Sequence, residues 1–194
     1  MAKPRITLFV DIVSPFAYLA FYALHNFPVF KQYKDKWINT ERLRWSSYLQ
    51  IPISKAAPPG FPTNTISLQR VLTALSLSHP NSVPSALSLF WQNYWVHYND
   101  PTKPETMLAL MKTIVGSEEE ATKVIEASKS DEVKKKLSDN TEWAFKEEAF
   151  GLPWFVATNA KGETERYWGV DHMGQLCDHL GLERPGGKGW KALL

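Results

Sequence analysis

Cysteine is almost absent from this sequence of 194 residues, which contains only Cys177. A single cysteine excludes a disulfide within the chain, a cluster of thiolate metal ligands and a Cys-x-x-Cys redox centre. Cys177 shares a helical face with Met173 and Leu180, so we expect a packed core thiol rather than a nucleophile. The five histidines show no metal-ligand spacing and form no His-Glu-x-x-His motif, so we expect no metal.

Excess charge and long apolar segments are also lacking. The formal net charge is +2, which gives no electrostatic basis for binding nucleic acid. Residues 12–30 and 71–99 carry no charge, but proline, histidine and asparagine interrupt both, and neither is apolar enough to cross a bilayer. The first five residues have no apolar core of a secretory signal. These features predict a soluble, intracellular protein without a membrane or nucleic-acid partner; mitochondrial, peroxisomal and cytoplasmic locations stay open.

The elements that the sequence does predict begin with a strand and a helix. Residues 6–10, Ile-Thr-Leu-Phe-Val, predict a short buried strand. Ser14 and Pro15 have the pattern of an N-cap followed by the first helical position. Asn26 and Pro28 predict the end of this first helix.

A second parallel strand normally follows such an opening, but none is evident here. Residues 29–36 are charged and short, and residues 39–49 already predict another helix. Every periodic segment between 58 and 149 is then helical. The predicted features are a helix from Asn64 or Thr65 to Leu77, a helix at 83–98, a helix opening at Pro104, a capping box at Ser117 and Glu120, and a charged helix at 132–148 with Leu137 and Phe145 inward.

Strand character returns after Gly151. Residues 152–157 and 164–168 predict two strands around a turn at 159–162. Residues 173–180 predict a last helix, which ends at a glycine.

This order of elements predicts the fold class. A β-α unit, a block of helices and a β-β-α unit together predict an α/β protein with a thioredoxin-like fold interrupted by an inserted all-helical domain. The thioredoxin-like domain is expected to comprise residues 1–38 and 150–194, and the helical insertion residues 39–149.

The start of the first helix is a candidate site for a thiolate. Backbone N–H groups and the positive end of the helix dipole favour an anion there. The hydroxyl of Ser14 can donate one more hydrogen bond to a bound thiolate. The alternative is that Ser14 only caps the helix, and the motif taken alone favours that simpler role.

Two positions in the C-terminal part are also candidates. A cis peptide between Leu152 and Pro153 would turn the chain sharply and present the Leu152 backbone to a peptide ligand. A trans proline at a strand start is the alternative, but the order of elements favours cis. Asp171 could accept the α-amino group of a γ-glutamyl unit, although taken alone it predicts only a carboxylate at a helix start.

Three segments in this order resemble the kappa-class glutathione transferases. They are Asp-Ile-Val-Ser-Pro-Phe-Ala-Tyr at 11–18, Gly-Leu-Pro-Trp at 151–154 and Tyr-Trp-Gly-Val-Asp-His-Met at 167–173. That family includes the 2-hydroxychromene-2-carboxylate isomerases and is related to bacterial disulfide oxidases. The resemblance spans nearly the whole chain, the helical insertion included.

The resemblance implies a homodimer that binds glutathione as co-substrate in a groove at the end of the thioredoxin sheet. A small hydrophobic electrophile is the second partner that it implies. Ser14 matches the family serine whose hydroxyl meets the glutathione sulfur, with Pro15 beside it in the binding motif.

The remaining implied glutathione contacts lie in the C-terminal part. Leu152 and Pro153 match the cis-proline turn that pairs with the tripeptide backbone, and Val170 and Asp171 match the pair that holds the γ-glutamyl end. Val170 departs from the family, which usually has serine there. The family also has a second strand and a covering loop after the first helix, and this sequence lacks both.

The function that the resemblance implies is that of a kappa-type glutathione transferase. The enzyme would activate the glutathione thiol as a thiolate for conjugation or peroxide reduction. A glutathione-dependent isomerase of the 2-hydroxychromene-2-carboxylate type begins with the same activated sulfur and stays open. So does a catalytically impaired relic that binds glutathione or a partner, which the missing loop and Val170 favour.

Overall fold

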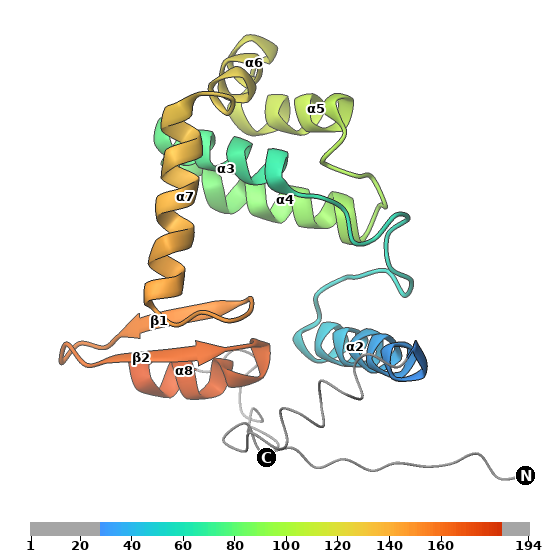
Figure 1. The fold of residues 1–194 in the computed structure, drawn as a ribbon, viewed down its shortest axis with the longest axis vertical. Coiled ribbons are helices and arrows are strands. Elements are labelled where there is room, and N and C mark those ends of the chain that lie inside the picture. Colours follow the sequence, from blue (N-terminus) through green and yellow to red (C-terminus); the bar gives the residue numbers. More distant parts are fainter. Residues whose placement is uncertain (1–27, 184–194) are drawn as a thin grey trace, which may run out of the picture. The chain divides into compact units, whose positions relative to one another are not determined.

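The computed structural model describes the backbone of residues 28–183 and the side chains from residue 36 onward (Figure 1). The chain divides into two compact units, Met1–Ala56 and Ala57–Leu194. The predicted first strand and helix, with Ser14 and Pro15, lie outside the described residues. None of the helices in the described range is both long and apolar enough to span a membrane.

The described part of the first unit is one long helix, α2 (Pro28–Leu49). The prediction of a short charged segment before a separate helix at 39–49 was wrong, because the helix already includes residues 28–38. Proline needs no N–H partner at the first helical position, so Pro28 can begin a helix as readily as end one. The Arg42 guanidinium ties the following chain to α2 by donating to the carbonyls of Ser54 and Lys55, both at 2.9 Å.

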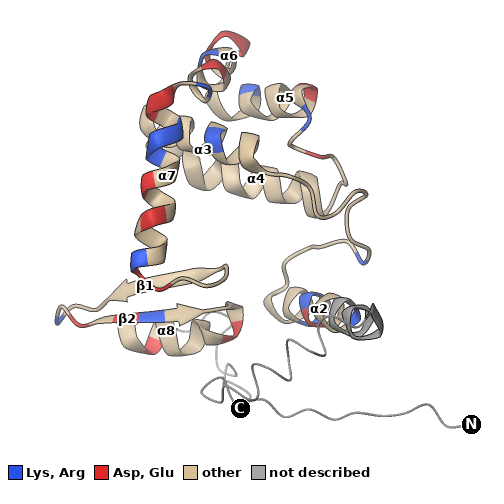
Figure 2. Ribbon diagram, viewed as in Figure 1, with Lys and Arg blue, Asp and Glu red and all other residues tan. Residues whose placement is uncertain are grey.

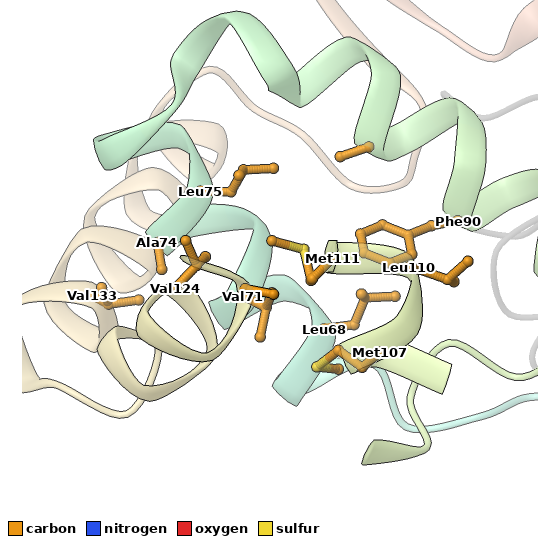
Figure 3. Packing of buried hydrophobic residues seen from close by; sticks show 12 residues of the cluster. Leu68, Val71, Ala74, Leu75, Phe90, Met107, Leu110, Met111, Val124 and Val133 are labelled. Carbon is orange, nitrogen blue, oxygen red and sulfur yellow. The ribbon is translucent and has the colours of Figure 1, made fainter. Parts of the chain in front are cut away.

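The second unit begins with a block of helices around one apolar core. They are α3 (Ile66–Ser78), η1 (Pro80–Ser82), α4 (Val83–Trp95), α5 (Pro104–Val115), α6 (Glu118–Ala127) and α7 (Asp131–Lys146). Figure 3 shows side chains from α3, α4, α5, α6 and α7 meeting in this core. Val71, Leu75 and Met111 are its largest fully buried side chains. Burial of such a side chain contributes about 1.5–3 kcal/mol, so the block has a core of its own.

Polar caps set several of the helix starts. The Ser117 hydroxyl accepts the N–H of Glu120 at 3.2 Å, as the capping box predicts. The Asn64 side chain accepts the N–H of Ile66 at 3.0 Å, while Thr65 occupies the N-cap position without a side-chain cap. The Ser130 hydroxyl accepts the N–H of Val133 and so caps α7. The sequence therefore located these starts to within one or two residues.

Two predictions within the helical block were wrong. Helix α4 ends at Trp95, before the predicted Tyr98, whose φ of 55° is left-handed. Phe145 was expected to face inward, but it is 69% exposed. Val133, at the start of α7, is buried against the block, whereas the later turns of α7 continue away from it towards the next strand (Figure 1). The 3.6-residue period identifies a common face but not how far along it the neighbouring helices reach.

The described part of the chain ends with a hairpin and a helix. Strands β1 (Trp154–Thr158) and β2 (Thr164–Trp168) pair antiparallel, and Trp154 lies opposite Trp168. A short turn, η2 (Val170–His172), leads directly into α8 (Met173–Leu180). Helix α8 packs on both strands and buries Cys177, which confirms the predicted core thiol. The β-β-α order predicted after Gly151 is confirmed.

Candidate functional site

The open end of the hairpin brings together the four predicted residues that the structure describes. We call Leu152, Pro153, Val170 and Asp171 the hairpin-end site. Pro153 directly precedes β1 and Gly169 directly follows β2, and the Gly169 N–H donates to the Pro153 carbonyl at 3.0 Å. The strand pairing therefore places Pro153 and Gly169, which are 16 residues apart in sequence, next to each other.

Leu152 presents its backbone and its side chain at this end. The peptide between Leu152 and Pro153 is cis, as the order of elements predicted. The Leu152 side chain is 86% exposed. Within the described range, its N–H and carbonyl have no backbone hydrogen-bond partner. Both groups can therefore pair with an extended peptide ligand in the manner of an added strand.

Asp171 lies in the turn that begins the last helix. Its side chain is 63% exposed, and it lies within the first turn of the continuous η2–α8 segment. A carboxylate is stabilised there by the unpaired N–H groups and the positive end of the helix dipole. Its negative charge can in turn receive a ligand ammonium group.

Gly169 shapes this turn through its backbone. Its φ is 87° and its ψ is 158°, a combination that residues with a Cβ atom rarely adopt. A Cβ atom at this position would also collide with Oδ1 of Asp171. The glycine therefore allows the carboxylate to fold back over the turn.

His172 adds a nitrogen to the same turn. Its Nδ1 atom lies 3.4 Å from Oδ1 of Asp171, within ion-pair range. Nδ1 is itself buried and has no hydrogen-bond partner. Sequence reasoning missed this residue, because a histidine following an aspartate has no distinctive spacing.

An aromatic cluster borders the hairpin-end site, and the sequence did not single it out. The Phe150 ring packs against Trp154 and Trp168 with centroid distances of 5.3 and 5.0 Å. Phe150 is 70% exposed and Trp168 is 44% exposed. The rings are tilted against one another by 71° and 55°, so the cluster forms an uneven aromatic surface on the segments that flank the hairpin-end site. Its one sequence signal is that Phe150 and Trp168 each precede a glycine of the site motifs.

Helix α8 is fastened to the hairpin by His179. The Nε2 atom of His179 lies 3.1 Å from the carbonyl oxygens of both Ala157 and Glu163. The neighbouring Tyr167 has its pKa raised, first by partial burial and then by the charges of Glu165 and Asp178. The raised pKa favours the protonated form of the phenol.

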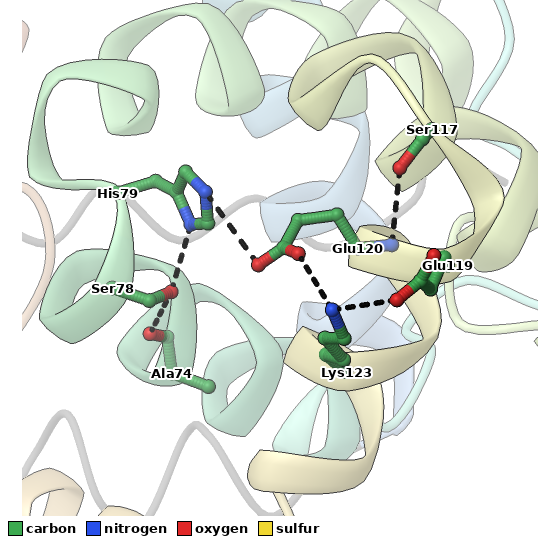
Figure 4. A network of polar contacts seen from close by, with 7 residues as sticks. All are labelled: Ala74, Ser78, His79, Ser117, Glu119, Glu120 and Lys123. Atoms are coloured by element: carbon green, nitrogen blue, oxygen red, sulfur yellow. Dashed lines mark hydrogen bonds and ion pairs between the residues drawn. The ribbon is translucent and has the colours of Figure 1, made fainter.

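The helical block contains a separate shallow cavity of about 290 Å³ between α3, α6 and α7. Figure 4 shows the polar side chains at its edge, where Lys123 pairs with Glu119 at 2.8 Å and with Glu120 at 3.4 Å. The Glu119 carboxylate raises the pKa of Lys123. In the part of the chain that the structure describes, no group of three or more metal-ligating side chains occurs. The polar chemistry at this edge is thus already satisfied within the protein.

Charge is distributed rather than concentrated on the described surface. Figure 2 shows acidic and basic residues alternating along α6 and α7. On α7, Lys134 pairs with Asp131 at 3.0 Å and Lys135 with Asp139 at 2.8 Å. Exposed pairs of this kind contribute about 0.3–0.5 kcal/mol each, so they support helix formation and do not mark a binding site.

Comparison with known proteins covers almost the whole chain. Residues 5–181 match the family model described as the DSBA-like thioredoxin domain, which confirms the predicted fold class. Glutathione S-transferase kappa 1 of Homo sapiens is 29% identical, with 92% of each chain covered. The Rattus norvegicus protein of the same name is 26% identical over 92% of each chain. That of Caenorhabditis elegans is 20% identical over 94% of this chain and 93% of its own.

The same comparison bears on the expected absence of a second strand and covering loop. The human alignment runs over 216 positions, whereas 92% of the 194 residues is about 178, so about 38 positions have no counterpart in this chain. Helix α2 is continuous from Pro28 to Leu49, the region in which the strand and loop are expected to be missing. It also crosses residues 38 and 39, the expected first domain boundary.

Proposed function

Because the chain belongs to the DsbA-like thioredoxin domain family, we propose that it is a kappa-type glutathione transferase. The observation that carries the proposal is the hairpin-end site, where the Gly169 N–H to Pro153 carbonyl bond of 3.0 Å joins the chain segment of Leu152 to that of Asp171. Glutathione is a peptide with an ammonium group at one end. The site offers one backbone for the peptide and one carboxylate for the ammonium group.

The proposed ligand lies along the open end of the hairpin. The Leu152 N–H and carbonyl pair with its peptide backbone, as an extended ligand pairs with a strand edge. The α-amino group of the γ-glutamyl unit lies against Asp171, whose side chain is 63% exposed. Val170 supplies the neighbouring backbone of the turn and, being apolar, adds no side-chain hydrogen bond.

The proposed chemistry takes place at the start of the first helix. The N–H groups of that helix and the Ser14 hydroxyl stabilise the glutathione thiolate, with Pro15 beginning the helix. The thiolate forms a bond to the electrophilic carbon, and the leaving group departs with its electron pair. With a hydroperoxide, the thiolate attacks the outer oxygen, the O–O bond breaks and the alkoxide leaves to become the alcohol. The resulting glutathione sulfenic acid reacts with a second glutathione to give glutathione disulfide and water.

The acceptor substrate is proposed to be a small hydrophobic electrophile. The exposed rings of Phe150 and Trp168 beside Leu152 support an apolar molecule at this end. A homodimer and a helical insertion at residues 39–149, between thioredoxin-like parts at 1–38 and 150–194, belong to the same proposal.

A second candidate is a relic that binds glutathione or a partner without turnover. The specific observations in its favour are Val170, where the family usually has serine, and the roughly 38 aligned positions missing from this chain. A glutathione-dependent isomerase is a further alternative, since it uses the same activated sulfur.

The test is a calorimetric titration with glutathione followed by turnover of chlorodinitrobenzene. We expect saturable binding by the natural protein, and Ser14→Ala to reduce turnover at least about tenfold by removing one hydrogen bond to the thiolate. Ser14→Asn separates the two roles of this residue, because asparagine caps helices but has no hydroxyl. Ser14→Thr keeps both functions.

The outcomes distinguish the candidates. A Ser14→Asn protein that folds but has lost turnover supports a role in the chemistry, and unchanged turnover in it leaves Ser14 as a cap only. Binding without turnover by the natural protein supports the relic. A folded protein that does not respond to millimolar glutathione overturns the proposed function.

A further inference from the structure

Oδ1 of Asp171 is confined on two sides within its own turn. On one side, Oδ1 lies so close to the Gly169 backbone that a Cβ atom on that residue would collide with it. On the other side, Nδ1 of His172 lies 3.4 Å away. Oδ1 therefore faces the protein, and Oδ2 is the oxygen left for a ligand.

The His172 nitrogen lacks a partner that it should have. Among the described residues, Nδ1 of His172 and Nε1 of Trp154 are the buried side-chain nitrogen or oxygen atoms without a hydrogen bond. A buried polar atom without a partner destabilises the folded state, so such atoms are uncommon in native proteins. A shift of a few tenths of an ångström towards Oδ1 would give Nδ1–H a charge-assisted hydrogen bond.

We infer that His172 is a positioning residue for Asp171: its Nδ1–H holds Oδ1 so that Oδ2 receives the ammonium group of the ligand. The inference rests on the proposed function, since it gives His172 an effect on glutathione affinity at the same site. His172 does not touch the reacting sulfur in this arrangement.

The first measurement compares three substitutions at this position. His172→Phe removes both ring nitrogens, His172→Asn keeps an amide donor near the Nδ1 position, and His172→Gln moves the donor towards the Nε2 position. We expect His172→Phe to weaken glutathione binding about three- to tenfold, less than the loss of a direct hydrogen bond to a charged group, because His172 acts on the ligand through Asp171. His172→Asn should restore affinity to within about twofold, and His172→Gln should not.

The second measurement uses a glutathione analogue in which hydrogen replaces the α-amino group. We expect the natural protein and His172→Phe to bind this analogue equally, because it has no ammonium group for Asp171. In steady state, His172→Phe should raise KM for glutathione and leave kcat unchanged, since the γ-glutamyl end does not react. An equal loss of affinity for both ligands, or no rescue by His172→Asn, overturns the inference.

A third measurement does not depend on glutathione at all. Urea unfolding midpoints are compared for the natural protein, Asp171→Asn, His172→Phe and the double variant, which form a double-mutant cycle. Non-additive midpoints support the contact, and additive midpoints overturn the inference whatever the ligand result. If the cycle shows coupling but the natural protein binds no glutathione, the proposed function fails and the ligand part of the inference fails with it.

Discussion

At the scale of single residues, the hairpin-end site depends on backbone conformation as much as on side chains. Gly169 adopts a φ of 87° next to Asp171, and its N–H holds the Pro153 carbonyl. A residue without a Cβ atom thus lets one turn contact the cis-proline segment and carry the carboxylate. The position of Asp171 follows from a neighbour that has no side chain.

Gly169→Ala tests this arrangement, with Gly162→Ala as a matched control. Gly162 also has a positive φ, 83°, but a Cβ atom there would meet nothing within 4 Å. We expect both changes to cost about 1–2 kcal/mol of unfolding free energy from the backbone alone. Only Gly169→Ala should also weaken glutathione binding, because its Cβ atom displaces Oδ1 of Asp171.

Urea unfolding and calorimetric titration of the two variants provide the check. Equal glutathione affinity in both would show that the close approach of Gly169 to Asp171 has no role in binding.

At the scale of elements, one side chain of the last helix contacts two separate backbone segments of the hairpin. His179 Nε2 lies 3.1 Å from a carbonyl in β1 and from one beside the hairpin turn. A nitrogen that carries a proton can share it between both oxygens. Because η2 continues directly into α8, the same contact helps to fix the position of Asp171.

His179→Phe should lower the unfolding free energy by about 1–3 kcal/mol, since two carbonyls lose their shared donor. His179→Gln places an amide nitrogen near Nε2 and should recover part of this loss. Thermal unfolding followed by circular dichroism measures both. Equal melting temperatures for His179→Phe and the natural protein would contradict this role.

Local sequence patterns predicted most of these elements but not their neighbours. The hairpin strand 164–168 and the helix 173–180 were predicted with the observed bounds, because alternation, a turn rich in asparagine and glycine, and a terminal glycine are local signals. Phe145 was misplaced because its exposure depends on where α7 leaves the block. Pro28 begins α2, because proline suits the first helical position, whereas the predicted end of the first helix lies outside the described residues.

In the candidate site, too, local motifs were predicted from the sequence but tertiary contacts were not. Leu152, Pro153, Val170 and Asp171 were identified from motif order, and the structure brings them together. His172 and the Phe150–Trp168 contact were missed, because a ring next to a glycine or an aspartate has no periodicity that marks it. Whether Oδ1 or Oδ2 faces a ligand depends on distances that no sequence pattern contains.

At the scale of the whole molecule, an ion pair joins the helical block to the hairpin. Arg166 on β2 donates from Nε and Nη2 to Oε2 of Glu147, at 3.0 and 2.6 Å. Glu147 directly follows α7, and its side chain is 21% exposed. The pair therefore connects the end of the longest helix of the block to the sheet that carries the site.

Charge exchange tests this connection. Glu147→Lys should place two cations together and lower the unfolding free energy by about 1 kcal/mol, an effect that weakens at high salt because the pair is partly exposed. The double variant Glu147→Lys, Arg166→Glu should recover most of the loss. Urea unfolding at 0.05 and at 1 M sodium chloride, conditions chosen for this test, measures both effects. Failure of the double variant to recover would show that the pair does not join the two parts.

The burial of Cys177 has a practical consequence for following the reaction. Cys177 is the sole thiol of the sequence, and only 8% of its surface is exposed. A disulfide reagent that reports free thiols should therefore detect the tripeptide in a native reaction mixture and leave the protein silent. The decrease in reagent colour over time then measures the glutathione consumed, and no correction for the thiol of the protein is needed. Denaturing the same mixture should release one further equivalent per chain, which gives the protein concentration from the same sample.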